Sequence, residues 1–416
     1  MILTWDTNPA VKGTFKMRWQ TIGKVYLASA AAALLLWNQT AFADTKVIKI
    51  GAPLALTGAL ANSGKKQKLG YDLWLDRINK AGGIKVGNET YRVEIVTYDY
   101  QTNGKRAGEL AEKLINDDKV NFMTAPFGSG HTKVTAAVAE RYGVPIIAVA
   151  SSEAVHNQGF KYLFGTLSPS DGLITGMIKK FKATKKGLKS IAILGREDVF
   201  PNLMAKLMKA GAEKAGIKIV YQGSYPIGTV DHSAAFTAMR RAKPDWVYVT
   251  GYSQDLILAR KQMADLGLKP PVVTMITGPV YREFIDTLGP LAENVTSATW
   301  WHWSTPFKSD DVFGSTKAFY DAVVKATGGT EPDYVHASSA AALVVLQKAI
   351  EKAGTLDRAA VRKALTELDT TTFFGPIKFG PNGMNTSREL PLIQIQSGKP
   401  ILIFPDRLAG GPMKLN

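Results

Sequence analysis

The chain carries the same order of strands and helices twice, and this repetition constrains the fold more than any other feature. The first pass starts with the β-branched run at 47–54 and alternates strands with helices up to Ala150; the second runs from Ser190 to Ile276. Ala81-Gly82-Gly83-Ile84 in the first pass corresponds to Ala215-Gly216-Ile217 in the second. Because alternating strands and helices favour a parallel sheet covered on both faces, the sequence predicts an α/β fold with two similar doubly wound parallel-sheet lobes.

The last third of the chain contains too few strands for a third lobe. It holds a strong helical pattern from Tyr334 to Ala353, a second one from Asp357 to Leu368, and then short strands with Pro/Gly turns. We therefore expect the chain to return and complete both lobes, crossing between them near Gly165, Thr299 and Thr372. This predicts a multi-strand hinge and a ligand cleft between the lobes, with lobe 1 formed by 44–165 plus 299–372 and lobe 2 by 166–298 plus 373–416.

The N-terminal segment has the three parts of a secretory signal peptide. Basic residues precede an apolar stretch from Val25 to Trp37, and Ala41-Phe42-Ala43 follows as an A-x-A cleavage pattern. The apolar stretch is shorter than the roughly 20 residues that a membrane-spanning helix needs. We predict that residues 1–43 are a signal peptide and that the mature chain begins at Asp44 and is exported to the periplasm.

The composition excludes several classes of protein. The 416 residues include no cysteine, which removes disulfides, zinc fingers, iron–sulfur clusters and a lipid anchor on an N-terminal cysteine. The net charge of +16 raises the question of nucleic-acid binding. However, the basic residues are dispersed over predicted helices without interleaved aromatic residues or a known binding module. We expect a soluble protein, not lipid-anchored, with no nucleic-acid partner.

The motifs of cofactor-dependent and hydrolytic enzymes are absent. No G-x-G-x-x-G follows the first strand and no Walker loop occurs, and the five histidines are scattered without metal-ligand spacing. Ser129 lies in Phe127-Gly128-Ser129-Gly130, which is not the G-x-S-x-G of hydrolases, and His131 follows too closely to suggest a triad partner. The sequence predicts no enzyme, no catalytic residues, no cofactor and no metal.

The loops after the predicted strands indicate where a ligand would bind, because ligands of doubly wound sheets bind beyond the carboxyl ends of the strands. In the first lobe these loops are uncharged and rich in hydroxyl groups and glycine: Asn62, Ser63, Ser129, Gly130, Thr132, Ser151 and Ser152. Two of the loops lead into helices, whose first backbone N–H groups favour an anion such as a carboxylate. The alternative is that each serine only caps its helix. Phe200 and Tyr252 in the second-lobe loops could cover the apolar part of a ligand.

Several segments, in order along nearly the whole mature chain, resemble the Leu/Ile/Val-binding family of periplasmic ABC-transporter substrate-binding proteins, which have the type I periplasmic binding fold. The segments are Ile48-Lys49-Ile50-Gly51, Pro53 to Gly58, Pro126 to Gly130, Val144-Pro145-Ile146-Ile147 with Ser151-Ser152, Tyr162 to Thr166, and Asp245-Trp246-Val247-Tyr248. The resemblance implies a receptor for amino-acid transport that closes two lobes on a small-molecule ligand and delivers it to an inner-membrane ABC permease. It also implies a monomer without catalytic activity.

The resemblance carries over individual binding positions. Ser129 falls on the serine that binds the ligand carboxylate in relatives, and Ser151 and Ser152 fall in the next loop, whose backbone and hydroxyls would join it. Ser63 replaces an aromatic residue, Phe200 replaces a tyrosine, and Tyr252 matches a family tyrosine. With Gly130 and Thr277, these are the candidate ligand-binding residues.

One departure from the family pattern bears on the ligand. The acidic residue that holds the ammonium group of an amino acid would fall near Ile276 or Thr277, where no carboxylate stands. A buried ammonium without a carboxylate partner costs several kcal/mol, as an order of magnitude. We therefore favour slightly an aromatic or other organic acid over leucine, isoleucine or valine. An amino acid remains the alternative, because Asp198 or Asp255 could replace the missing acid.

Two other readings of the same residues stay open at this point. A ligand sensor that docks on a membrane receptor would share every residue discussed, and a secreted hydrolase would need a catalytic pair that the sequence does not supply. The cluster Trp300-Trp301-His302-Trp303 lies at the second predicted crossing. If it is a strand, Trp301 and Trp303 share one face, and one of the two faces could reach the cleft. Packing within the hinge is the equally weighted alternative.

Overall fold

The computed structural model describes residues 46–183, 188–387 and 389–416. The predicted signal peptide, residues 1–43, lies outside the described residues. Lys46–Asn416 form one compact unit, which contains two large sheets and a small two-stranded one.

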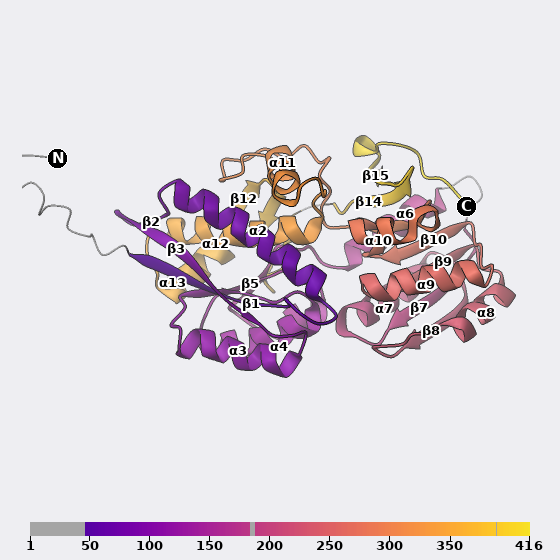
Figure 1. Ribbon diagram of the computed structural model, residues 1–416, viewed down its shortest axis with the longest axis horizontal. Helices are drawn as coiled ribbons and strands as arrows, with labels where there is room; N and C mark the ends of the chain where they lie inside the picture. The colour runs from indigo at the N-terminus through magenta and orange to yellow at the C-terminus, as the bar shows by residue number, and fades with distance from the viewer. Residues whose placement is uncertain (1–45, 184–187, 388) are drawn as a thin grey trace, which may run out of the picture. The chain divides into compact units, whose positions relative to one another are not determined.

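The first sheet has six strands in the order β2-β3-β1-β4-β5-β6. Its strands are β1 (Val47–Leu54), β2 (Ile84–Val86), β3 (Glu89–Asp99), β4 (Phe122–Thr124), β5 (Ile146–Ala148) and β6 (Leu163–Gly165). All neighbours pair in parallel except the β2–β3 hairpin. Its helices are α2 (Ala61–Lys80), α3 (Gly104–Asn116), α4 (Ser129–Arg141) and α5 (Glu153–His156). In Figure 1, α2 and the later helix α12 (Tyr334–Ala353) cover one face and α3 and α4 the other.

The second sheet has seven strands in the order β15-β14-β11-β10-β9-β7-β8. They are β7 (Ser190–Arg196), β8 (Lys218–Tyr225), β9 (Trp246–Thr250), β10 (Val272–Ile276), β11 (Thr296–Ala298), β14 (Leu392–Gln396) and β15 (Lys399–Phe404). The first five of these pair in parallel, whereas β14 pairs antiparallel with both β11 and β15. The accompanying helices are α6 (Asp171–Lys182), α7 (Val199–Lys214), α8 (Ser233–Ala242), α9 (Ser253–Asp265) and α10 (Arg282–Leu288), with 3-10 turns at Gly278–Val280, Gly289–Ala292 and Asp406–Leu408.

The α/β prediction with two similar doubly wound sheets is confirmed. Both sheets are built on central strands that are buried over most of their length, as β-branched runs favour for strands covered on both faces. The sequence did not predict that β14, near the end of the chain, runs antiparallel to both of its neighbours, β11 and β15.

The last third of the chain contributes to both sheets. After β11 and α11 (Thr316–Thr327), helix α12 packs on α2 and β2 beside the first sheet. Helix α13 (Arg358–Thr366) packs on α12, and β12 (Asp369–Thr372) and β13 (Gly375–Lys378) form the two-stranded sheet. The chain then adds β14 to the second sheet beside β11. The exact division into the two predicted lobes stays a prediction.

No helix within the described ranges combines the length and the apolar character that crossing a membrane requires.

Candidate functional site

A cavity of about 260 Å³ is lined by loops from both sheets. Loops that follow β4, β5 and β6 supply Phe127, Gly128, Ser129, Val149, Ala150, Ser151 and Leu167. The remaining lining residues are Phe200 at the start of α7, Tyr252 before α9, Trp300 after β11, and Tyr334, which begins α12. The cavity lies at the carboxyl ends of the strands, where doubly wound sheets bind ligands.

The loop between β4 and α4 is held from three directions. The buried amide of Gln67 accepts a hydrogen bond from the Phe127 N–H at 2.8 Å and donates one to the Ala125 carbonyl at 3.2 Å. The Tyr100 hydroxyl donates to the Phe127 carbonyl at 3.3 Å, and the Thr132 hydroxyl donates to the Pro126 carbonyl at 3.0 Å. These bonds fix the loop before any ligand binds, so its backbone is already ordered.

Helix α4 begins at this loop without a side-chain cap. Its N-cap is Gly128, whose φ of 92° lies in the region that favours glycine and which offers no side chain to the first-turn N–H groups. Ser129 follows as the first helical residue and is 2% exposed. The free N–H groups of a helix start, together with the positive end of the helix dipole and a nearby hydroxyl, form a site for an anion.

Aromatic rings enclose the opposite side of the cavity. The ring centroids of Phe127 and Tyr252 lie 6.0 Å apart, and those of Phe200 and Trp300 lie 5.8 Å apart. The rings of Trp300 and Tyr334 are 4.9 Å apart, and the Trp300 indole N–H donates to the Ser168 carbonyl at 3.0 Å. Burial raises the pKa of Tyr252 well above its ordinary value, so its hydroxyl stays protonated. The cavity thus joins a polar end, at the start of α4, to an apolar enclosure.

Two carboxylates that adjoin the cavity residues Phe200 and Tyr252 are already engaged. The Arg196 guanidinium, which lies over the Tyr252 ring at 5.0 Å, pairs with Asp255 at 2.6 Å and with Asp198 at 3.6 Å. Asp255 also accepts the Tyr252 N–H at 2.9 Å, and Asp198 caps α7 by accepting the Val199 N–H at 2.6 Å. Both acids therefore have structural partners.

The structure brings four of the predicted site residues to the cavity wall: Ser129, Ser151, Phe200 and Tyr252. The hydroxyl of Ser151 accepts a hydrogen bond from Ser170 at 3.1 Å. The other predicted residues lie outside the set that lines this cavity.

The four predicted residues that do not line the cavity lie in different parts of the fold. Ser63 lies in the first turn of α2, and Gly130 lies in the first turn of α4, where a Cβ would come 3.5 Å from Asp198. Ser152 is the fully buried N-cap of α5. Thr277 has a φ of 74° and donates its N–H to the Ser297 hydroxyl at 3.1 Å.

The tryptophan cluster is not a strand, so the predicted alternation of its side chains is wrong. Strand β11 ends at Ala298, and a turn closed by the Thr305 N–H and the His302 carbonyl at 3.1 Å follows. Trp300 reaches the cavity described above, whereas Trp301, His302 and Trp303 all line a second cavity.

Sequence reasoning missed Leu167 and Tyr334 as cavity residues. Leu167 lies just beyond the end of β6, and its position gave no signal. Tyr334 directly follows Asp333, which caps α12 by accepting the Val335 N–H at 2.8 Å. This aspartate could have revealed where α12 starts, but the sequence does not show that Tyr334 lies at the cavity.

No group of three His, Asp or Glu side chains suited to a metal ion occurs in the described ranges. His131, the neighbour of Ser129, instead contacts the Thr102 carbonyl at 3.3 Å and stacks obliquely on Tyr100. Burial lowers the pKa of His131 despite that contact and the nearby Asp198.

The sequence is similar to curated solute-binding proteins over almost its whole length. It is 27% identical over 406 residues to the Leu/Ile/Val-binding protein homolog 7 of Brucella suis, covering 94% of this chain and 99% of that protein. It is also 27% identical over 365 residues to the leucine-, isoleucine-, valine-, threonine- and alanine-binding protein of Pseudomonas aeruginosa, covering 88% of this chain and 93% of that one.

Solved structures share the fold. A leucine-binding protein of Thermotoga maritima superimposes with a TM-score of 0.77 at 22% identity, covering 86% of this chain and 99% of that one. A branched-chain amino acid transporter substrate-binding protein of Streptococcus pneumoniae, in complex with isoleucine, superimposes with a TM-score of 0.73 at 22% identity. The match covers 85% of this chain and 98% of that one. A solute-binding protein of Rhodopseudomonas palustris, in complex with 3,4-dihydroxybenzoic acid, superimposes with a TM-score of 0.73 at 22% identity. The match covers 85% of this chain and 95% of that one.

The family model described as "Periplasmic binding protein" matches residues 47–400, which is most of the chain. Proteins of this kind bind substrates for ABC transporters and are not enzymes. With the two doubly wound sheets and the enclosed cavity at their strand ends, this match shows that the chain belongs to the periplasmic binding protein family, of the Leu/Ile/Val-binding type.

Proposed function

We propose that this chain is the periplasmic receptor of an ABC import system and binds a small organic acid that carries no ammonium group. It acts as a monomer and delivers the ligand to an inner-membrane permease. The observation that carries the proposal is the uncapped start of α4 at Gly128 and Ser129, set against an aromatic enclosure in one cavity. The carboxylate of the ligand binds at the helix start and its apolar body lies among the rings.

The charges beside the cavity support a ligand without an amino group. An ammonium needs a carboxylate of its own, because a buried charge without a partner is strongly unfavourable. Asp198 and Asp255 share one arginine and cap α7 and α9, so neither is reserved for a ligand. Relatives with the same fold include one in complex with isoleucine and one with 3,4-dihydroxybenzoic acid, so the fold accepts both classes.

A matched pair of ligands tests the proposal directly. Leucine and 4-methylpentanoate have the same carbon skeleton and carboxylate, and differ only in the ammonium group. We expect 4-methylpentanoate or an aromatic acid such as benzoate to raise the melting temperature of the purified chain, while leucine does not. A ligand at a hundred times its Kd adds about 2.7 kcal/mol to the free energy of unfolding, which a thermal shift detects easily. Stabilisation by leucine alone would refute the absence of an ammonium.

Ser129→Ala is expected to weaken binding of the stabilising acid by about tenfold to a hundredfold. We infer that this hydroxyl donates to the bound carboxylate, and hydrogen bonds to charged groups contribute about 1.5–3 kcal/mol. Ser253 offers a matched control, because it begins α9 as Ser129 begins α4 but does not line the cavity. Isothermal titration of both variants should show a weakened Kd for Ser129→Ala only. Equal affinities would place the carboxylate elsewhere.

Arg196→Met is expected to change the ligand preference toward amines. Removing the guanidinium frees Asp255 and Asp198, which would then need a cation beside the Tyr252 ring. We expect the ratio of leucine affinity to 4-methylpentanoate affinity to rise by at least tenfold in titrations of the variant. An unchanged ratio would show that Asp198 and Asp255 do not influence which ligand binds.

A further inference from the structure

An ion pair joins a helix of the first sheet to a helix of the second. The Lys66 ammonium on α2 lies 2.9 Å from the Glu283 carboxylate on α10. Helix α2 packs on β1 and β3 of the first sheet, whereas α10 packs on α9 beside the second. The pair therefore spans the same two halves of the molecule whose loops enclose the candidate ligand cavity.

A hydrogen bond beside this pair makes the same connection. The Tyr281 hydroxyl, just before α10, lies 2.9 Å from the Tyr334 hydroxyl at the start of α12, a helix that packs on α2. The two rings stack with centroids 6.0 Å apart, and the Lys66 ammonium lies 4.1 Å from the centre of the Tyr281 ring. Because Tyr334 also lines the candidate ligand cavity, these contacts continue directly from its wall.

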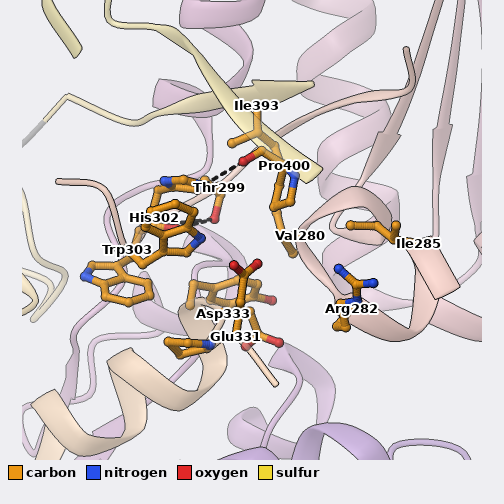
Figure 2. Close-up of a pocket in the computed structure, with 13 residues that line it drawn as sticks. Val280, Arg282, Ile285, Thr299, His302, Trp303, Glu331, Asp333, Ile393 and Pro400 are labelled. Carbon is orange, nitrogen blue, oxygen red and sulfur yellow. Dashed lines mark hydrogen bonds between the residues drawn. The ribbon is translucent and has the colours of Figure 1, made fainter. Parts of the chain in front are cut away.

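The packing between α10 and the helices of the first sheet is otherwise sparse. Helix α10 packs extensively on α9 and on the adjacent 3-10 turns, but it makes few contacts with α2 or α12. Figure 2 shows Arg282 and Ile285 of α10 across a small cavity from Asp333, which directly precedes α12. The polar contacts of Lys66 and Tyr281 could therefore break and re-form without disturbing the core of either sheet.

The charges around Lys66 allow its bond to Glu283 to break without isolating a buried charge. Lys66 also pairs at 2.8 Å with Asp333, which is 4% exposed and belongs to the α12 side of the contact. Burial opposes the charge of Lys66, but the two carboxylates outweigh burial and raise its pKa. Glu283 is 27% exposed. If α10 moves away, Lys66 keeps Asp333 and water solvates Glu283, which avoids the large cost of an unpaired buried charge.

We propose that Lys66 and Glu283 form a latch that holds α2 and α10 together when the two sheets close over the ligand cavity, and that this latch sets ligand affinity without touching the ligand. The proposal rests on the proposed receptor function, in which the sheets separate to admit the ligand. The apparent Kd of a ligand rises as the closed population falls. Loss of the latch therefore weakens binding by shifting that population, and the two side chains act as positioning residues.

Spin labels can measure closure of the ligand-free chain, because the chain contains no cysteine of its own. Labels on Lys65→Cys and Thr287→Cys, at exposed positions on α2 and α10, report the separation of the two helices. We expect Glu283→Gln to shift the distance distribution to longer values. Asp286→Asn is the matched control, because its carboxylate pairs with Arg282 within α10, and it should cause no shift. No shift in Glu283→Gln, or an equal shift in both variants, would overturn the proposal even if Glu283→Gln were less stable.

Ligand binding gives the second test, with benzoate or 4-methylpentanoate as the probe. Glu283→Gln is expected to weaken binding of the acid that stabilises the unchanged chain by about threefold to tenfold, mainly through faster dissociation in stopped-flow fluorescence. Glu283→Asp keeps the charge and should recover part of the affinity, and Asp286→Asn should have full affinity. Full affinity in Glu283→Gln would refute the latch. If neither acid binds the unchanged chain, the proposed ligand class is wrong, and the label distances still decide whether the latch exists.

Discussion

Replacing Asp333 with alanine is expected to lower the free energy of unfolding by about 3–5 kcal/mol, because it leaves a buried lysine without its closest partner. Lys66 on α2 contacts Asp333 at 2.8 Å and Glu283 at 2.9 Å, and its ammonium lies 4.1 Å from the centre of the Tyr281 ring. The Asp333 carboxylate is 4% exposed and also caps α12. Urea unfolding of the purified chain measures the effect.

Asp286→Ala is the matched control for this prediction. Its carboxylate pairs with Arg282 within α10 but is 55% exposed, and pairs of this kind contribute only about 0.3–0.5 kcal/mol. If Asp333→Ala lowers the free energy of unfolding no more than Asp286→Ala does, then burial does not increase the contribution of the Asp333 carboxylate to stability.

The same carboxylate makes stability depend on pH. Burial opposes ionisation of Asp333, but Lys66 and His336 outweigh it and hold its pKa well below the ordinary value. A group whose pKa is lowered on folding stabilises the protein above its unfolded pKa of about 3.9, and that contribution is lost as the pH falls toward the folded pKa. The melting temperature should therefore fall below about pH 4, and less steeply in Asp333→Asn. If the melting temperatures of the unchanged chain and of Asp333→Asn fall equally with pH, Asp333 is not the source of this pH dependence.

Gly64→Ala is expected to lower the free energy of unfolding by about 3 kcal/mol or more. A Cβ on Gly64 would lie 1.9 Å from the Ala55 carbonyl oxygen and 2.9 Å from its Cα, and backbone atoms cannot move aside as a side chain can. Helix α2 would have to move away from the end of β1, and overpacking of a well-packed core costs typically 1–3 kcal/mol, occasionally more.

Gly104→Ala provides the comparison, because Gly104 also lies at a helix start but its Cβ would meet nothing closer than His131 at 4.0 Å. We expect that variant to be neutral or more stable by up to about 1 kcal/mol, since alanine favours a helix over glycine. Similar losses in both variants would mean that helix-start glycines matter for their flexibility and not for close approach.

The sequence predicted most of the fold, because periodicity and β-branched runs report burial directly. The strands at 47–54 and 246–250 were recognised for this reason, as every residue of β9 is buried. Parallel sheets then place the loops of successive strands at one edge, which is why Ser129, Ser151, Phe200 and Tyr252 were found to lie together.

Other parts of the site depend on tertiary packing that spacing along the chain does not encode. Ser63 was expected in a loop, but α2 begins at Ala61 and carries it into the helix. Thr277 has a left-handed backbone, which the sequence does not signal for a threonine. Tyr334 and Trp300 meet although 34 positions separate them, because α12 returns to the first sheet.

The late return of the chain to the second sheet limits how genes of this kind can recombine. Strand β14 pairs with β11 through only three residue pairs, and between them lies α12, which belongs with the first sheet. A crossover between two related genes within 300–390 would join β11 of one parent to β14 of the other. Such chimeras inherit a mismatched strand pair even when each sheet is otherwise intact, so variation in ligand preference should spread by point substitution more readily than by exchange of halves.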